Sequence, residues 1–592
     1  MYCQSYGFLR RNSDISMMNK LRSFYQQYKN FITNIVFPLI LLIYPLIKVN
    51  QGIDVSDSTY SLSNALYFPK LRGMWVVSTY LSNVVGFILT NLPFGTTLLG
   101  MNVYTGLIVS ALALVVYLML RKWMPDWIVF AGEFIALGFL WIPTGILYNY
   151  LTYFLFALGA LFLYKGLVEE KSKYLLVAGV VLGVNVWVRI PNLTEMALIG
   201  MLWYHQWLNK KTVKETFRKT GICVGGYALG VAVPAIMVFV QYGIQGITDM
   251  ISGLSGIQST DHTYSVFSML LATLEAYIRS FKWVMFVLIG MGMGFIMFAL
   301  MRDRFILIKK LIYGVGLCVL LRFFWGRGMF SFRYYEDYTS MYEWGMMGLY
   351  LAIVACVYLF AGKGVSLNER LFGMMSFIII MITPIGSNNY TYQNLNNLFV
   401  VAPVTMYAFV KLYRRRVHPD AKNYAFVWQS TLMVIGVMIF VQTVGFHTQF
   451  VFRDGMDGSK RDTKVSANGV VAGMYTTAQN AKDLEGLITC FENNKRQEAI
   501  YFGDCPGLPF ILQMPSAVDS SWSELDSEPI GKLESNLMEL EELPYVVIRN
   551  IEPSSISFMD KLELLHDFMG VHHYDEVYVN DTYSVYAPSW ND

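Results

Sequence analysis

Apolar runs recur along most of this 592-residue chain, and their length limits the folds that it can adopt. About 20 apolar residues cross a bilayer as one helix, because a helix satisfies its backbone hydrogen bonds internally. The pattern therefore predicts a polytopic α-helical membrane protein with about 13 transmembrane helices. The runs lie at 31–48, 98–120, 127–145, 147–164, 174–190, 192–208, 220–241, 282–301, 306–322, 345–361, 371–386, 397–412 and 426–446.

The composition excludes several other classes of protein. Hydrophobic residues make up 55% of the chain and charged residues 15%, whereas soluble domains carry about 25% charged residues. The chain is therefore neither a cytosolic globular protein nor a disordered one. Its six cysteines are also too few for a secreted scaffold built on disulfides.

Basic residues gather at the N-terminus and at every second connection between the expected helices. By the positive-inside rule, these connections face the cytoplasm. Thirteen helices in the cell membrane then place the N-terminus in the cytoplasm and the C-terminal region outside. The basic residues of these connections include Arg121, Lys122, Lys165, Lys171, Lys173, Lys210, Lys211, Lys214, Arg218, Lys219, Arg302, Arg304, Lys309, Lys310, Lys363, Arg370, Lys411, Arg414, Arg415, Arg416 and Lys422.

The segment 76–92 is also apolar enough to cross a membrane. Counting it as a span would place Arg121 and Lys122 outside and would break the alternation of charge. We therefore interpret this segment as a helix that lies at the membrane interface or re-enters the bilayer.

Charge and composition divide the chain into four parts. A basic N-terminus, 1–30, precedes a transmembrane domain, 31–446, whose first outer loop covers 49–97. A polar linker, 447–475, leads to an extracytoplasmic α/β domain, 476–592. From 447 onward there are 24 acidic and 10 basic residues, so the preceding part carries the positive charge. In the last domain, periodicity predicts helices at 477–494, 528–542 and 557–570, strands at 499–503 and 544–549, and a closing hairpin.

Motifs that bind nucleotides or catalytic zinc are absent from the sequence. There is no GxxxxGK[ST], no GxGxxG between a strand and a helix, no HExxH, no CxxC and no GxSxG. Nucleotide-dependent chemistry therefore has no support from the sequence.

The first outer loop carries the candidate catalytic residues. Asp54 and Asp57 are three residues apart and share one face if this segment is the first turn of a helix. A carboxylate beside apolar residues can have a raised pKa and can act as a base. The alternative is that Asp57 only caps the helix that follows it.

The plan of the whole chain resembles the GT-C class of membrane glycosyltransferases. This class includes the protein mannosyltransferases and the bacterial aminoarabinose and lipopolysaccharide-core sugar transferases. Its members have about a dozen spans, a soluble outer C-terminal domain and an acidic pair in the first loop, often Asp-Glu, followed by Tyr. Here Asp57-Ser58-Thr59-Tyr60 matches the Asp and the Tyr but replaces Glu with Ser, and Asp54 offers the other carboxylate.

This resemblance implies a sugar donor carried on a polyprenyl phosphate and a glycan, lipid or protein of the cell envelope as acceptor. Asp57 would act as the general base that takes the proton of an acceptor hydroxyl. The hydroxyl would then attack the anomeric carbon with inversion, and the polyprenyl phosphate would leave. Asp54 would assist Asp57 or would hold a divalent metal ion together with it.

A lipid phosphate requires cationic partners, and three arginines are candidates. Arg189 stands just before Pro191 at the outer end of a span, in a break that is similar to one in bacterial GT-C proteins. Arg327 and Arg333 flank a cluster of aromatic residues. Arg189 has an alternative role, in which its side chain extends to the membrane interface or pairs with Glu195. The segment with Arg327 and Arg333 can instead be an aromatic belt at the membrane interface with charged residues at its rim.

Polar residues at the outer ends of the spans are candidates for binding the sugar and the acceptor. Amide side chains can bond to sugar hydroxyls, and rings can pack on the sugar. Capping of helix ends explains the amides about as well. The candidates are Tyr60, Asn149, Asn192, Asn388, Asn389 and Glu343.

Two other functions remain open from the sequence. A transporter or flippase of lipid-linked glycans would need buried charges at mid-membrane and usually repeated halves. A non-catalytic membrane scaffold with an outer binding domain would not need the acidic pair to face a cavity.

Overall fold

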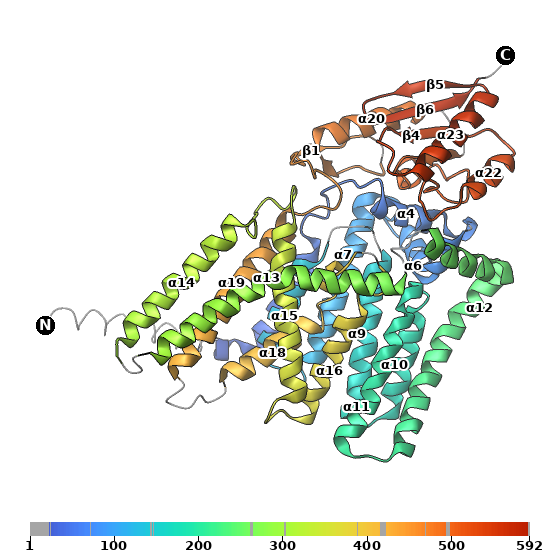
Figure 1. Ribbon diagram of the computed structural model, residues 1–592. Coiled ribbons are helices and arrows are strands. Elements are labelled where there is room, and N and C mark those ends of the chain that lie inside the picture. Colours follow the sequence, from blue (N-terminus) through green and yellow to red (C-terminus); the bar gives the residue numbers. More distant parts are fainter. Residues whose placement is uncertain are drawn as a thin grey trace.

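The computed structural model describes most of the chain (Figure 1). Most of the basic N-terminus, 1–30, and the candidate sugar-binding residue Asn388 lie outside the described residues. The described residues are 23, 25–71, 73–141, 145, 147–260, 265–300, 304–387, 389–414, 422–467, 469–492 and 498–589.

Helices make up nearly all of the chain before the C-terminal domain. The helices up to the middle of the chain are α2 (Lys29–Phe31), η1 (Ile32–Val36), α3 (Phe37–Ile43), η2 (Tyr44–Leu46), α4 (Asp57–Tyr67), η3 (Phe68–Lys70), α5 (Met74–Ser78), α6 (Tyr80–Thr90), α7 (Leu98–Leu120), α8 (Asp126–Phe139), α9 (Leu147–Val168), α10 (Ser172–Asn185), η4 (Ile190–Ile199), α11 (Gly200–Asn209) and α12 (Val213–Thr260), which kinks at Gly243. The later ones are α13 (Val266–Ala299), α14 (Ile306–Gly326), α15 (Thr339–Ala361), α16 (Leu367–Ile382), α17 (Tyr392–Asn396), α18 (Val401–Arg414) and α19 (Lys422–Gln449).

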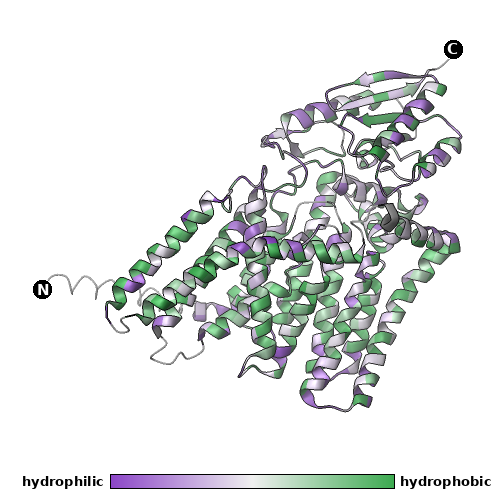
Figure 2. Cartoon of the chain, viewed as in Figure 1, coloured by the Kyte–Doolittle hydropathy of each residue, from purple (hydrophilic) through white to green (hydrophobic). Residues whose placement is uncertain are grey.

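Helices that can cross a membrane confirm that the chain is a helical membrane protein, and Figure 2 shows that hydrophobic residues predominate along them. Each of the thirteen runs expected to span contains a helix, but only seven helices in the described part are both long and apolar enough. The number thirteen is therefore not confirmed. Helices such as α8 and α10 have 14 residues, which is about 21 Å at 1.5 Å per residue and shorter than the hydrocarbon core. The seven segments are Lys29–Leu46, Leu98–Leu120, Leu147–Val168, Val213–Gly256, Val266–Ala299, Thr339–Ala361 and Asn423–Gln449.

The apolar segment 76–92 forms no full span. It contains the end of α5 and the whole of α6, which has 11 residues. An 11-residue helix is about 17 Å long and cannot cross the hydrocarbon core alone. This length is consistent with a helix at the interface or one that re-enters the bilayer.

Two pairs of glycines bring α10 and α12 into close contact. Gly179 and Gly183 of α10 are four residues apart, as are Gly226 and Gly230 of α12. A Cβ atom at any of the four would lie 2.0–2.3 Å from a carbonyl oxygen of the other helix. Without these side chains the two backbones can touch, which is how helices commonly associate in membranes.

The C-terminal domain contains a four-stranded mixed sheet with the strand order β3-β4-β6-β5. Strands β3 (Ala499–Phe502) and β4 (Tyr545–Arg549) are parallel, whereas β5 (Tyr574–Val579) and β6 (Tyr583–Pro588) form an antiparallel hairpin beside β4. The helices are α20 (Ala478–Glu492), α21 (Leu508–Leu512), α22 (Ile530–Met538) and α23 (Ile556–Val571). The expected α/β domain is confirmed, and β1 (Thr463–Lys464) and β2 (Tyr475–Thr476) precede it.

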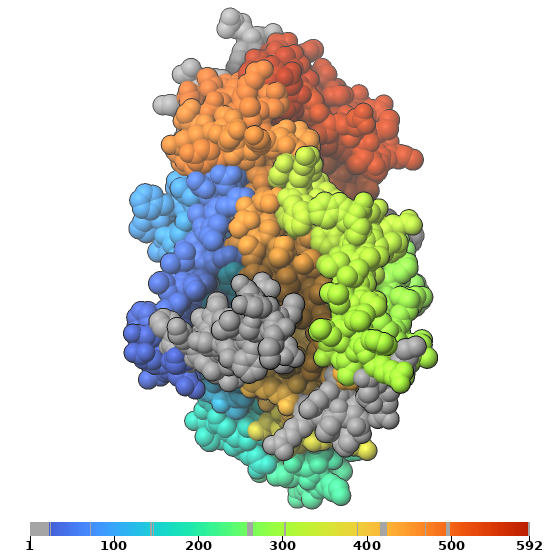
Figure 3. All heavy atoms as spheres, turned by 90° about the vertical axis from the view of Figure 1, so that its left-hand side faces the viewer, coloured from blue at the N-terminus to red at the C-terminus, as the bar shows by residue number. Residues whose placement is uncertain are grey.

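The two faces of this sheet pack against different partners. Ile500 and Val546 pack with α22 and α23, whereas the alternate residues Tyr501 and Val547 pack with α20. The apolar cluster that contains Tyr501, Val547 and α20 also includes residues of the first loop, such as Ile53 and Leu62, and residues of α7 and α9. The domain and the helical part therefore share one apolar core. Figure 3 shows the domain covering one end of the molecule, which we call the domain-bearing end.

Backbone contacts fasten the C-terminal domain to α4. The N–H of Gly507 donates to the carbonyl oxygen of Val55 (2.8 Å), and the N–H of Phe510 donates to Ser63 Oγ (3.1 Å). A Cβ atom at position 507 would lie 1.7 Å from Thr59 Oγ1, so only glycine permits this approach.

Candidate active site

The turn before α4 is stabilised by Asp54. Its Oδ2 accepts a hydrogen bond from the N–H of Ser58 (2.9 Å), and its Oδ1 accepts one from the N–H of Ser56 (2.9 Å) and another from the Ser56 hydroxyl. The side chain is buried. Asp54 therefore satisfies N–H groups that a helix start leaves without partners, and this fixes where α4 begins.

Asp57 is the first residue of α4, and its carboxylate faces a guanidinium. Oδ2 lies 3.5 Å from Nε of Arg453, which follows α19. Burial raises the pKa of Asp57 to about 6, with Arg453 opposing the shift and the charges of Asp54 and Asp504 adding to it. A carboxylate with this pKa is mostly ionised at neutral pH, yet it is more basic than an exposed aspartate.

Asp57 also lines a pocket where several helices end. The pocket encloses about 80 Å³ and is lined mainly by polar and aromatic side chains. A volume of this size holds a few water molecules, so a sugar can enter only if the pocket widens. The lining residues are Asp57, Trp141, Tyr148, Asn149, Tyr150, Tyr153, Arg189, Ser387, Asn389, Gln393, Asn396 and Phe452.

Arg189 supplies the positive charge of this pocket. It stands in the break between α10, which ends at Asn185, and η4, which contains Pro191 in its first turn. Its guanidinium donates a hydrogen bond to the carbonyl oxygen of Gly386 and lies 5.7 Å from the centre of the Tyr148 ring. No ion pair neutralises Arg189 among the described residues, so its charge is available to an anion.

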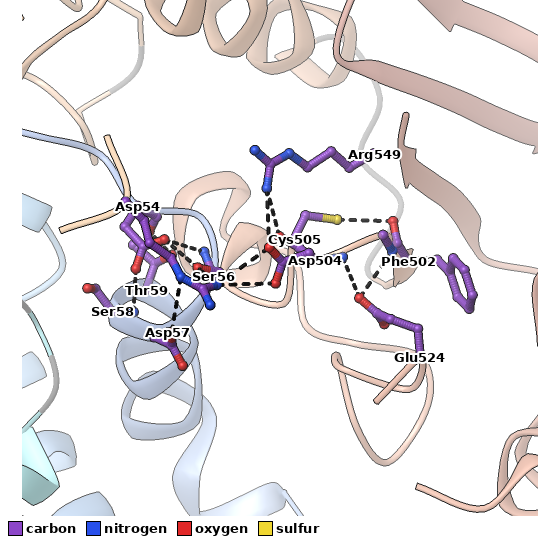
Figure 4. A network of polar contacts seen from close by, with 12 residues as sticks. Asp54, Ser56, Asp57, Ser58, Thr59, Phe502, Asp504, Cys505, Glu524 and Arg549 are labelled. Carbon is purple, nitrogen blue, oxygen red and sulfur yellow. Dashed lines mark hydrogen bonds and ion pairs between the residues drawn. The ribbon is translucent and has the colours of Figure 1, made fainter. Parts of the chain in front are cut away.

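Arg453 connects Asp57 to the C-terminal domain. Its Nη1 donates to Ser56 Oγ (2.8 Å) and lies 3.5 Å from both carboxylate oxygens of Asp504. Nη1 of Arg549, at the end of β4, lies 3.7 Å from Asp504, so two guanidinium groups contact this carboxylate (Figure 4). The carboxylate of Glu524 accepts hydrogen bonds from the backbone N–H groups of residues 503 and 504.

The backbone at this network is unusual. Arg453 and Asp504 have φ angles of +50° and +55°, in the left-handed region that side chains other than Gly rarely adopt. Such conformations cost free energy and concentrate at functional sites. The surrounding hydrogen bonds hold both residues in these conformations.

The structure brings together four of the residues singled out from the sequence. Asp57, Asn149, Arg189 and Asn389 come from distant segments and line the same pocket.

Tyr60 and Asn192 do not line this pocket. Tyr60 contacts Trp522 of the C-terminal domain edge to face, with ring centres 5.3 Å apart. Asn192 is buried, and its amide donates to Thr152 Oγ1 (2.8 Å) and to the carbonyl oxygen of Asn185 (2.9 Å). Its contacts stabilise the helix break next to Arg189.

The aromatic cluster near α14 is also separate from the pocket. Arg327 lies 5.6 Å from the centre of the Phe323 ring, and exposed Arg333 lies 3.6 Å from Glu336. Glu343 lies in the first turns of α15. None of the three candidates lines the pocket around Asp57.

The acidic pair is not arranged to hold a metal ion. The oxygens of Asp54 accept hydrogen bonds from the helix start, and those of Asp57 face Arg453. In the part of the chain that the structure describes, no group of three His, Cys, Asp or Glu side chains could bind a metal. The contacts of both carboxylates therefore do not fit the metal site that the resemblance implies.

Several residues of the site are not apparent from the sequence. Arg453 and Asp504 belong to a polar linker and to a tight turn after β3, and neither stands in a recognisable motif. Trp141 and Gln393 line the pocket from helix ends that the apolar pattern does not distinguish. The one local feature that could have drawn attention to Arg453 is its position shortly after the last long helix, and this feature is weak.

Comparisons with known proteins identify the fold. No protein-family model and no curated protein matches the sequence. A crystal structure of ArnT from Cupriavidus metallidurans bound to undecaprenyl phosphate has a TM-score of 0.50 and 10% identity, covering 94% of this chain and 98% of that one. An apo oligosaccharyltransferase of Archaeoglobus fulgidus has a TM-score of 0.45 and 13% identity, covering 89% and 70%. The chain therefore has the fold of ArnT along nearly its whole length, which confirms the resemblance to GT-C transferases at the level of fold.

Proposed function

We propose that the protein is a membrane glycosyltransferase that moves a sugar from a polyprenyl-phosphate donor to an acceptor of the cell envelope, at the outer face of the membrane. The observation that carries this proposal is the pocket itself. In a fold shared with ArnT, it combines a carboxylate of raised pKa, Asp57, with the cation of Arg189. These are the two charges that transfer from a lipid phosphate requires.

Each charged residue has a defined part in the proposed reaction. Asp57 accepts the proton of an acceptor hydroxyl, whose oxygen attacks the anomeric carbon with inversion. The bond between that carbon and the phosphate oxygen breaks, and the polyprenyl phosphate leaves with the electron pair. Arg189 stabilises the negative charge that develops on the leaving phosphate.

The amides of the pocket are suited to bind the sugar. Asn149 and Asn389 line it from α9 and from the segment after α16. Each amide offers both donors and an acceptor, as sugar hydroxyls require. We assign Asp54 to the positioning of Asp57, because its hydrogen bonds fix the start of α4.

An apolar groove beside the pocket suits the lipid part of the donor. It encloses about 510 Å³ between α8, α15, α18 and α19. Phe139 lines the groove and Trp141 lines the pocket, so both reach the region where α8 ends. An isoprenoid chain in the groove would bring its phosphate toward Arg189.

Loss and restoration of one envelope glycan tests the proposal. A strain that lacks the gene should lose one sugar from a surface glycan, lipid or protein, detected by mass spectrometry. The wild-type gene should restore it, and so should Asp462→Asn, a matched change at an exposed aspartate of the linker. Asp57→Asn should not restore it. Full restoration by Asp57→Asn at wild-type protein level would overturn the role of Asp57, and an unchanged glycan profile would overturn the function.

A further inference from the structure

A pocket separate from the candidate active site lies at the end of the helical bundle opposite to the domain-bearing end. It encloses about 780 Å³, within the range of ligand-binding pockets. It is formed where α7 and α15 end, where α16 begins and where α18 ends. The start of α7, by contrast, lies under the C-terminal domain, because the N–H of Leu98 donates to the carbonyl oxygen of Val470 (2.8 Å).

The pocket is strongly cationic. Five of its lining side chains are basic and one, Glu369, is acidic. The basic residues are Arg121, Lys122, Lys363, Lys411 and Arg414.

Two of these cations are already paired. Arg121 Nε lies 2.7 Å from Asp126, and Lys411 forms an ion pair with Glu369, which also accepts a hydrogen bond from the Tyr407 hydroxyl (2.7 Å). These pairs hold the wall of the pocket in place.

The other three cations have no acidic partner within 4 Å among the described residues. Lys122, Lys363 and Arg414 come from three different segments and line the same cavity. Like charges that converge on one cavity repel one another, and an anion relieves this repulsion. The pocket therefore offers three cations to a ligand with negative charge.

The surroundings indicate a lipid rather than a soluble anion. Trp123, Tyr358 and Tyr407 line the pocket, and such aromatic residues are enriched at membrane interfaces. Val410 lines both this pocket and the apolar groove between α8, α15, α18 and α19. A headgroup in the pocket would thus have apolar surface beside it for its acyl chains.

We propose that this pocket binds the phosphate headgroup of an anionic membrane lipid, at the opposite end of the bundle from the candidate active site. Basic pockets between transmembrane helices recognise such headgroups, and guanidinium and ammonium groups bind phosphate oxygens with charge-assisted hydrogen bonds. The proposal does not depend on glycosyl transfer, since the basic residues that would hold the headgroup do not line the candidate active site; the two ligands share only the apolar groove, which Val410 joins to this pocket.

Binding of defined lipids to the purified full-length protein tests the proposal. Native mass spectrometry in detergent should detect bound phosphatidylglycerol in preference to phosphatidylcholine. The double variant Lys363→Gln/Arg414→Gln should bind phosphatidylglycerol roughly tenfold to thirtyfold more weakly, because each basic residue near the surface contributes up to about fivefold. Both side chains are exposed, so the variant should fold.

A matched control and a competitor distinguish the possible sources of the anion. Lys214→Gln/Arg218→Gln removes two exposed charges from the first turns of α12, outside the pocket, and should leave lipid binding unchanged. Equal losses in the two double variants would overturn the proposal, because general charge would then explain the binding. Displacement of the lipid by millimolar inorganic phosphate would assign the site to a soluble anion and would overturn the lipid assignment. Lys122→Gln provides an independent single change, for which we expect weaker binding of phosphatidylglycerol.

Discussion

Nε of Arg453 lies 3.5 Å from Oδ2 of Asp57, and this contact joins the segment after the last long helix to the first helix of the first loop. Asp57 thus faces the pocket on one side and a guanidinium on the other. Because the same guanidinium lies beside Asp504, the C-terminal domain contributes to the electrostatics of the proposed base.

The first prediction concerns the pH dependence of transfer. The proposed base is active when ionised, so transfer should fall as the pH drops below the Asp57 pKa of about 6. The charge of Arg453 favours the ionised form, and its removal in Arg453→Gln should move the acid limb of the rate profile to higher pH by about one unit. Arg453→Lys keeps the charge and should move it less. An unshifted limb in Arg453→Gln, with Arg218→Gln as control, would contradict this role.

The second prediction separates Asp54 from Asp57. Asp57→Asn removes the base and should lower the transfer rate by about 10²- to 10⁴-fold. Asp54→Asn keeps an oxygen that can accept the N–H of Ser58, so it should retain most activity. Asp54→Ala should lower the free energy of unfolding by about 1 kcal/mol, the usual loss for a helix cap. If Asp54→Asn proves as inactive as Asp57→Asn, Asp54 takes part in the chemistry.

The third prediction concerns the donor. Arg189→Gln removes the cation of the pocket and should raise the KM for a polyprenyl-phosphate sugar by about tenfold or more, the loss expected for a charge-assisted hydrogen bond. It should also lower kcat, because the same cation is proposed to stabilise the charge that develops on the leaving phosphate. Arg189→Lys should recover part of the loss. Steady-state kinetics in reconstituted membranes give both constants, and an unchanged KM and kcat in Arg189→Gln would exclude Arg189 from donor binding.

The fourth prediction concerns the attachment of the C-terminal domain. Gly507→Ala places a methyl group 1.7 Å from Thr59 Oγ1 and should cost about 1–3 kcal/mol, as overpacking of a buried site does. Gly531→Ala is the matched control, because a Cβ atom there meets nothing within 4 Å. Thermal unfolding and limited proteolysis should distinguish the two, and equal stability of both variants would show that the contact can relax.

The sequence predicts the helical membrane part and the order of strands and helices in the C-terminal domain, because apolar periodicity is a local property. It does not predict the number of full spans, since short helices such as α8 are apolar without being long enough. The sequence indicates Asp57 and Arg189 as candidate site residues, because both stand next to predicted helix ends. It does not point to Arg453 or Asp504, because only the tertiary fold brings them to Asp57.

The same limit explains the candidates that lie elsewhere. Arg327 and Arg333 occur beside aromatic residues in the sequence, as a site for phosphate and sugar would require. The fold nevertheless leaves both arginines outside the pocket around Asp57. Asn192 is three residues beyond the pocket residue Arg189 and instead fixes the break in the helix. A residue that is close in sequence to a pocket residue can therefore support the local backbone as readily as it can line the pocket.

The apolar core that joins the C-terminal domain to α4, α7 and α9 has a consequence for the route of substrates. A cap that swung open to admit a donor would expose to water the apolar residues at this contact, such as Leu508 and Phe510 of α21, which packs on α4. Such an opening would cost the free energy of exposing this apolar area, whereas a rearrangement of pocket side chains would not. For the proposed reaction we therefore expect substrates to reach Asp57 sideways between helix ends, through rearrangement of lining side chains such as Trp141 and Tyr148.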